Sequence, residues 1–223
     1  MKLYSKKEIL PIILILAVFA IGLYFWPQLP ERVPTHWNVY GQIDGWSSRN
    51  FAVFFFPALI AGLYLLLSFI PLMDPLKKNI ELFSGLYFWF KIIFVLFMGA
   101  LYFLTIYAGL GHQIDIGRYV MIGIAVLFFF LGLMMPKIKK NYTIGIRLPW
   151  TLHSEVVWDK THQLGGKLFI GLAVIIAIIS LFSGPYAFRI LIGAIFAMLA
   201  ILIWYSYHEW RVLEKGRKTP NGA

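Results

Sequence analysis

The chain has 223 residues, of which 60% are hydrophobic and only 13% are charged, and its mean hydropathy is +0.76. A soluble domain carries about 25% charged residues, so this composition excludes an ordinary water-soluble protein and indicates an integral membrane protein. There is no cysteine, which excludes disulfides and thiolate metal sites. The net charge of +10 would also suit a nucleic-acid binder, but the positions of the charges favour another explanation.

Several apolar segments are long enough to cross a bilayer, which takes about 20 residues, with a range of about 17–25. Gly184-Pro185 separates the last two segments as a turn signal. The first segment is too long for a signal-peptide core and lacks a small-residue cleavage pattern, so we expect it to be retained. The sequence therefore predicts an all-α polytopic bundle of six transmembrane helices, at 9–26, 51–73, 85–108, 119–135, 168–183 and 186–207.

Lysine and arginine are divided unequally between alternate sides of these spans. Fifteen of the 20 lie in the N-terminus, the loop after the second span, the 136–167 segment and the C-terminal tail. The opposite side carries four, namely Arg32, Arg49, Arg118 and Arg189. The positive-inside rule makes the first side cytoplasmic. We therefore expect both termini in the cytoplasm, and we read the basic charge as a topology signal with no direct nucleic-acid binding.

The remaining cation, Lys91, lies inside the third span. It is about six residues from the cytoplasmic start, which places it ~9 Å into the membrane. At that depth the ammonium can reach the headgroups by snorkelling, and we expect it to do so. A buried partner such as Asp74 or Glu81 is the alternative.

The outer polar segment, 27–50, is rich in proline and in turn residues. Its three prolines favour an extended chain, so 36–39 could form a short strand, with turns at Tyr40-Gly41 and Asp44-Gly45. Ser47 or Ser48 is placed to cap the second span. Its aromatic residues would serve equally as interfacial anchors. The polar side chains among them favour a compact extracytoplasmic cap loop that contacts a ligand.

The inner polar segment, 136–167, begins where Pro136 stops the fourth span. Pro149 breaks a weak extended pattern, and Thr151 or Ser154 can cap a helix that runs to Leu164. Gly165-Gly166 should then end that helix. The sequence therefore predicts a short cytoplasmic amphipathic helix on the inner membrane surface.

On this predicted helix Glu155, Asp159 and His162 recur at one-turn spacing. They are weak candidate metal ligands, because no recognised ligand spacing accompanies them. A solvated helix face, with His162 bonded to Asp159, explains the same pattern. No nucleophile elbow or glycine-rich phosphate loop is present in the sequence. We therefore expect no catalytic residues, no enzyme activity and no cofactor.

The stretch NYTIGIRLPWTL, followed by SEVVWDKTHQLGGKLF, resembles the signature of the SdpI-like family of bacterial membrane proteins. The outer LPERVPTHWNVYGQIDGW looks like the domain of unknown function that often precedes that signature. Leu148 and Gln163 depart mildly from the pattern, where threonine and a basic residue are common. The residues that match in order are Asn141, Gly145, Arg147, Pro149, Trp150, Thr151, Glu155, Trp158, His162, Gly165 and Gly166.

The resemblance implies a protein of the bacterial cytoplasmic membrane that confers immunity to a secreted toxic peptide. It also implies signalling, in which a cytoplasmic ArsR-type repressor is held at the membrane once the peptide is sensed. We divide the chain into 1–83, with the cap loop 27–50, and an SdpI-like part at 84–223, with the signature loop 136–167. The oligomeric state cannot be read from the sequence.

Two hypotheses remain open. In the first, the protein is a receptor that senses a peptide outside and binds a partner inside. Its outer residues are His36, Trp37, Asn38, Gly41, Asp44 and Gly45, and its inner residues are Asn141, Gly145, Arg147, Pro149, Trp150, Glu155, Trp158, His162, Gly165 and Gly166. In the second, a small-molecule transporter or metal-dependent membrane enzyme uses Glu155, Asp159 and His162 as ligands or proton carriers.

Overall fold

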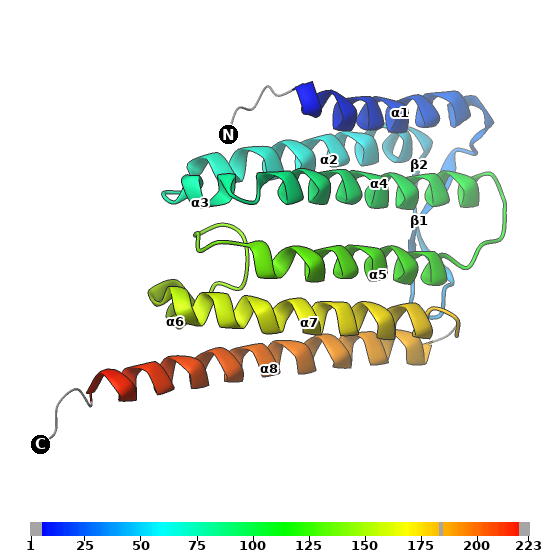
Figure 1. Ribbon diagram of the computed structural model, residues 1–223. Coiled ribbons are helices and arrows are strands. Elements are labelled where there is room, and N and C mark those ends of the chain that lie inside the picture. The colour runs from blue at the N-terminus through cyan, green and yellow to red at the C-terminus, as the bar shows by residue number, and fades with distance from the viewer. Residues whose placement is uncertain (1–5, 183–184, 219–223) are drawn as a thin grey trace, which may run out of the picture.

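The computed structural model describes residues 6–182 and 185–218, and it consists mainly of long helices that lie side by side (Figure 1). Six of them are long and apolar enough to cross a membrane, which confirms the predicted fold class of a multi-pass helical membrane protein. They are α1 (Ile9–Phe25), α2 (Arg49–Phe69), α4 (Ser84–Gly109), α5 (Ile116–Met134), α7 (Glu155–Ile179) and α8 (Pro185–Lys218).

Shorter elements lie at the ends of these helices. Three of the 3-10 helices carry a proline at their start, directly after an α-helix, because proline cannot donate the next backbone hydrogen bond. The short elements are η1 (Lys6–Glu8), η2 (Trp26–Gln28), β1 (Arg32–Trp37), β2 (Ile43–Ser48), η3 (Ile70–Met73), α3 (Lys77–Glu81), η4 (Met135–Lys137) and α6 (Pro149–His153).

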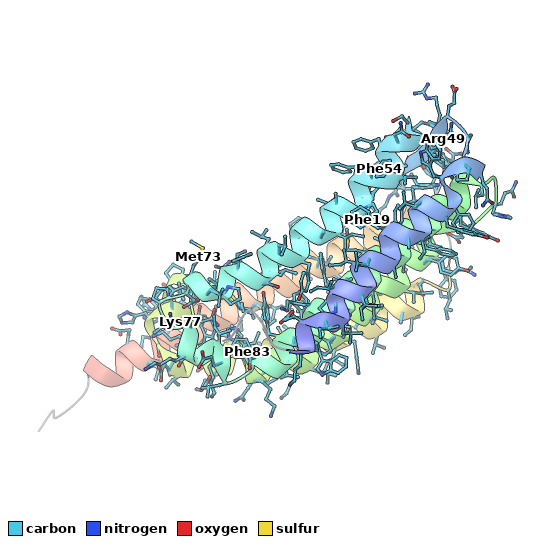
Figure 2. The ribbon with its side chains drawn as sticks, turned by 90° about the horizontal axis from the view of Figure 1, so that it is seen from above. Phe19, Arg49, Phe54, Met73, Lys77 and Phe83 are labelled. Carbon is cyan, nitrogen blue, oxygen red and sulfur yellow. The ribbon has the colours of Figure 1, made fainter. Side chains whose placement is uncertain are left out.

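The bundle has two distinct ends. The end that carries β1 and β2 is called the hairpin end, and the end that carries α3, α6 and the 138–148 loop is called the signature end (Figure 1). Arg49, at the start of α2, lies far from Lys77 and Phe83 of the signature end (Figure 2). Helix α1 begins, and α8 finishes, at the signature end (Figure 1). The two ends therefore separate the two polar segments found in the sequence.

The core consists of two three-helix groups and a junction between them. Helices α1, α2 and α4 enclose one cluster, which includes Val53, Ile60 and Ile106. Helices α5, α7 and α8 enclose a second, which includes Ile176 and Leu202. A third cluster at the signature end joins residues of α3, α4, η4 and α7. The signature end therefore joins the two groups, in addition to the direct contact between α4 and α5.

The separate amphipathic helix expected before Gly165 is wrong. Helix α7 runs unbroken from Glu155 to Ile179, so the predicted surface helix is the first part of the fifth span. Gly166 does not end the helix. It lies instead at the close approach between α7 and α5. A Cβ atom at Gly166 would be 2.8 Å from the carbonyl oxygen of Gly132. The glycine pair therefore allows close helix packing.

The expected snorkelling of Lys91 is also wrong. The residue is buried, with 3% of its surface exposed, and its ammonium lies 3.0 Å from a carboxylate oxygen of Glu8. Neither Asp74 nor Glu81 is its partner in this structure. Glu8 is the last residue of η1, directly before α1, and its carboxylate reaches Lys91 in the first turns of α4.

Candidate functional sites at the two ends of the bundle

At the hairpin end, β1 and β2 form an antiparallel hairpin. The strand predicted at 36–39 is confirmed at His36 and Trp37 and wrong at 38–39, which belong to the turn. The turn lies at Asn38–Gln42, since the side-chain oxygen of Asn38 accepts hydrogen bonds from the backbone N–H groups of Tyr40 and Gln42. Gly41 has φ +74°, which suits glycine. The expected turn at Asp44-Gly45 is wrong, because both residues lie within β2 and Gly45 pairs with His36.

The hairpin packs against the bundle at its base, and residues 39–42 at its tip are exposed. Val33 is completely buried in the cluster formed by α1, α2 and α4. The side chain of Ser48 accepts a hydrogen bond from the N–H of Phe51, which confirms a predicted cap of the second span. From this base the strands cross the end of the bundle toward α7 and α8 (Figure 1). The tip is thereby brought above helices that follow it by many residues in the chain.

A cleft of about 770 Å³ lies beneath the hairpin tip. Its walls come from the first turns of α5 and α8, which lie more than 65 residues after the hairpin in the chain. Five of the six predicted outer residues line it; Gly45 does not. These five are His36, Trp37, Asn38, Gly41 and Asp44.

The polar roof of the cleft contains two local charge contacts. The Nδ1 atom of His36 lies 2.5 Å from a carboxylate oxygen of Asp44, across the hairpin. Asp115 caps α5 by accepting from the N–H of Arg118, and its other oxygen lies 3.7 Å from the Nε of that arginine. Sequence reasoning did not assign Asp115 or Arg118 to a site. An aspartate directly before an apolar helix is a signal that could have found the cap.

At the signature end, the buried side chain of Asn141 organises the loop. Its oxygen accepts from the N–H groups of Thr143 and Ile144, and its nitrogen donates to the carbonyl oxygens of Lys139 and Ile144. Each hydrogen-bonding group of the amide therefore has a partner within the loop. The residue shapes the loop and does not face outward.

Asp74 ties this loop to the connection between α2 and α4. One carboxylate oxygen accepts from the N–H of Leu76, and the other accepts from the N–H of Tyr142 and the hydroxyl of Thr143. Asn79 donates to the carbonyl of Lys140 in the same region. Sequence reasoning missed this role, since contacts over more than 60 residues leave no local pattern.

His162 and Trp158 lie stacked beneath the loop, with ring centroids 4.1 Å apart. The Nδ1 of His162 lies 2.8 Å from the carbonyl oxygen of Trp158, and its Nε2 accepts from the N–H of Ile146. Because a carbonyl only accepts and an amide N–H only donates, the imidazole is neutral and carries its proton on Nδ1. Both ring nitrogens are therefore occupied by the backbone.

The predicted group of Glu155, Asp159 and His162 does not converge. His162 is buried, whereas Glu155 and Asp159 are exposed, and Asp159 lies 4.0 Å from the ammonium of Lys139 instead of binding the imidazole. Across 6–182 and 185–218, no three histidine, aspartate or glutamate side chains are grouped to hold a metal ion.

The short helix α6 connects the loop to α8. The indole N–H of Trp150 donates to the hydroxyl of Ser206 at 2.6 Å, and its ring packs edge-on against Tyr207. Lys160 of α7 forms an ion pair with Glu209 at 2.7 Å. Ser206, which the sequence reasoning did not single out, is completely buried at this contact.

The predicted signature residues therefore separate by exposure. Arg147, Pro149 and Glu155 are exposed, and Arg147 also donates to the carbonyl oxygen of Tyr142. Gly145 and Trp150 are half-buried. The remaining five, Asn141, Trp158, His162, Gly165 and Gly166, are buried.

Comparison with known proteins gives matches at both polar segments. Residues 13–61 match the Domain of unknown function (DUF1648), and residues 137–207 match the SdpI/YfhL protein family. Over 212 residues the chain is 26% identical to Immunity protein SdpI of Bacillus subtilis (strain 168), which covers 95% of this chain and 100% of the relative. No solved structure gives a significant match.

The first matched segment contains the hairpin, and the second contains the 138–148 loop, α6 and α7. The similarity to the immunity protein extends over both and over the helices between them. These findings confirm the resemblance to the SdpI-like family seen in the sequence, with a DUF1648 match ahead of the SdpI/YfhL match in a multi-pass membrane chain.

Proposed function

We propose that the protein confers immunity to a secreted toxic peptide, which it binds outside the cell in the cleft beneath the hairpin. The observation that carries this proposal is the convergence of His36, Trp37, Asn38, Gly41 and Asp44 on one cleft with α5 and α8. A mere connector between two spans would not need this arrangement. The similarity to an immunity protein along almost the whole chain supports the same function.

The outer site is tested by resistance of a sensitive bacterial strain to the purified sporulation-delaying toxin, the peptide that the family resemblance suggests. Trp37→Ala should abolish most of the protection, because the indole lines the cleft. Trp46→Ala is the matched control, since Trp46 is an exposed tryptophan of the same hairpin that does not line the cleft. Equal protection by both variants and the unchanged protein would overturn the proposal, provided that membrane levels are equal.

The proposal requires the hairpin end to face outward and both termini to face the cytoplasm. The unequal distribution of lysine and arginine supports this orientation. The chain has no cysteine, so single cysteines can report it directly. On intact cells a membrane-impermeant maleimide should label Gln42→Cys at the hairpin tip, and it should label Glu155→Cys only after the membrane is opened. The reverse pattern would contradict the orientation.

We also propose that the signature end binds a cytoplasmic ArsR-type repressor when peptide is present. The exposed side chains of Arg147 and Glu155 would make the contact, while the buried signature residues keep the loop in shape. Helix α8 supplies a route between the ends. Phe188 and Leu191 line the cleft, and Ser206 of the same helix holds Trp150.

Co-purification of the repressor with the membrane protein tests this second step. Arg147→Ala should reduce the bound repressor several-fold, whereas Lys78→Ala, an exposed cation outside the signature at the same end, should not. Trp150→Ala should reduce it as well, by releasing α6 from α8. Undiminished repressor in both signature variants would remove the signature face as the contact.

A further inference from the structure

The cleft beneath the hairpin extends well below the level of the hairpin. Its α5 wall reaches Ile124, eight residues after α5 begins, which corresponds to ~12 Å along the helix. Its α8 wall reaches Leu191, six residues after α8 begins, or ~9 Å. The hydrocarbon core of a bilayer is about 30 Å thick, close to the length of a 22-residue helical span such as Ile116–Lys137. The lower part of the cleft therefore lies at hydrocarbon depth.

The chemistry of the cleft changes with depth. Its polar side chains, among them Asn38, Asp44 and Asp115, lie at the top, on the hairpin and at the start of α5. Met121, Ile124 and Leu191 line the lower part. A wholly polar ligand would lose its hydration in the lower part without gaining partners there. A wholly apolar ligand would leave the acidic groups of the roof unused.

The charges at the roof favour a cation. Two carboxylates, Asp44 and Asp115, line the cleft against one permanent cation, Arg118, and His36 lies beside Asp44. The two aspartates and the arginine that line the cleft therefore sum to one formal negative charge.

We infer that the cleft takes an amphipathic peptide with a cationic end, whose apolar part enters the hydrocarbon layer between α5 and α8. This inference rests on the proposed peptide site and specifies the ligand and its depth. The cationic end lies between Asp44 and Asp115, under the hairpin tip. The apolar side chains lie against Met121, Ile124 and Leu191.

Site-specific photo-crosslinking in lipid nanodiscs tests the depth, with the purified sporulation-delaying toxin as the probe. A photoreactive residue is placed at Asn38 in the roof, at Ile124 in the lower wall, or at Val126. Val126 is the matched control, because it lies two residues further along α5, is 53% exposed and does not line the cleft. We expect crosslinks from Asn38 and Ile124, and at least fivefold less from Val126.

Each other outcome is decisive. Crosslinks from Asn38 alone would overturn the deep binding mode and leave the proposed peptide site intact. Equal crosslinks from Ile124 and Val126 would show that the peptide only dissolves in the lipid, and would overturn the inference. No crosslink from any position, together with no change in resistance from Trp37→Ala, would overturn both the inference and the proposed site.

The preference for a cation is tested separately. The double variant Asp44→Asn, Asp115→Asn should weaken toxin binding to the nanodisc-embedded protein at least about tenfold, a change that increases at lower ionic strength. The arginine variant Arg118→Gln should strengthen binding or leave it unchanged. Unchanged affinity in the aspartate double variant, or weaker binding in Arg118→Gln alone, would overturn the cationic end.

Discussion

The ammonium of Lys91 and the carboxylate of Glu8 form an ion pair inside the bundle, with Nζ 3.0 and 3.1 Å from the two carboxylate oxygens. Ser68 accepts a further hydrogen bond from Lys91, and the hydroxyl of Tyr64 donates to Glu8. Residues of three helical segments thus meet at one polar point. Charges at such depth are costly unless they are paired and fully hydrogen-bonded, which explains why each has several partners.

Removing one member of this pair should destabilise the protein more than removing both. Glu8→Gln leaves the buried ammonium of Lys91 without a counter-charge, at a cost of about 3 kcal/mol, the lower end for broken buried pairs because Glu8 is partly exposed. The double variant Glu8→Gln, Lys91→Met should recover most of that loss. The apparent melting temperatures of Glu8→Gln, Lys91→Met and the double variant in detergent measure the coupling between the two charges. Additive losses would show that the two charges do not stabilise each other.

The Asn141 amide should be necessary for the shape of the signature loop. Asn141→Ala leaves the N–H groups of Thr143 and Ile144 without their acceptor in a partly buried place, at about 1 kcal/mol for each. Hydrogen–deuterium exchange of the 141–148 peptide should become at least tenfold faster. Tyr142→Ala is the control, since that side chain is 48% exposed and should leave exchange nearly unchanged. If exchange stayed slow in Asn141→Ala, the loop would be held mainly by the hydrogen bonds of Asp74.

The sequence was sufficient for the number of spans, because an apolar run of membrane length is a local property. It also found the end of the first hairpin strand and a serine cap of the second span, which depend on neighbouring residues. It could not place Glu8 beside Lys91, since that contact depends on how α1 and α4 pack. The same limit applies to the cleft, whose hairpin and α8 walls meet only in the folded chain.

Gly145 should tolerate a side chain less well than Gly41, although both have a positive φ. At Gly145, with φ +116°, a Cβ atom would lie 2.4 Å from Nε2 of His162, whereas at Gly41 nothing lies within 4 Å. Gly41→Ala should therefore cost only the backbone strain, about 1–2 kcal/mol. Gly145→Ala adds the displacement of the imidazole from the N–H of Ile146. Fluorescence-detected size exclusion after a temperature series should show a clearly lower midpoint for Gly145→Ala; equal midpoints would show that the loop simply moves aside.

Gly166 could have one of two roles: it could end a helix, or it could allow α5 and α7 to pack closely. A helix-ending glycine would have a left-handed backbone and tolerate alanine poorly for that reason, but Gly166 lies inside a continuous helix. Alanine is a better helix former than glycine by about 1 kcal/mol, so only the contact with Gly132 and Pro136 opposes it. Gly171→Ala, five residues further along α7 with open space around it, should be neutral or slightly stabilising.

Gly166→Ala should lower the apparent melting temperature, because its Cβ would meet the backbone of α5, which cannot rotate aside as a side chain can. The same substitution at both positions thus separates helix propensity from helix packing. If Gly166→Ala were as stable as Gly171→Ala, α5 and α7 would have to lie further apart than in this structure, where a Cβ atom at Gly166 would be 2.8 Å from the carbonyl oxygen of Gly132. In that case the glycine pair would not be what permits the two helices to pack so closely.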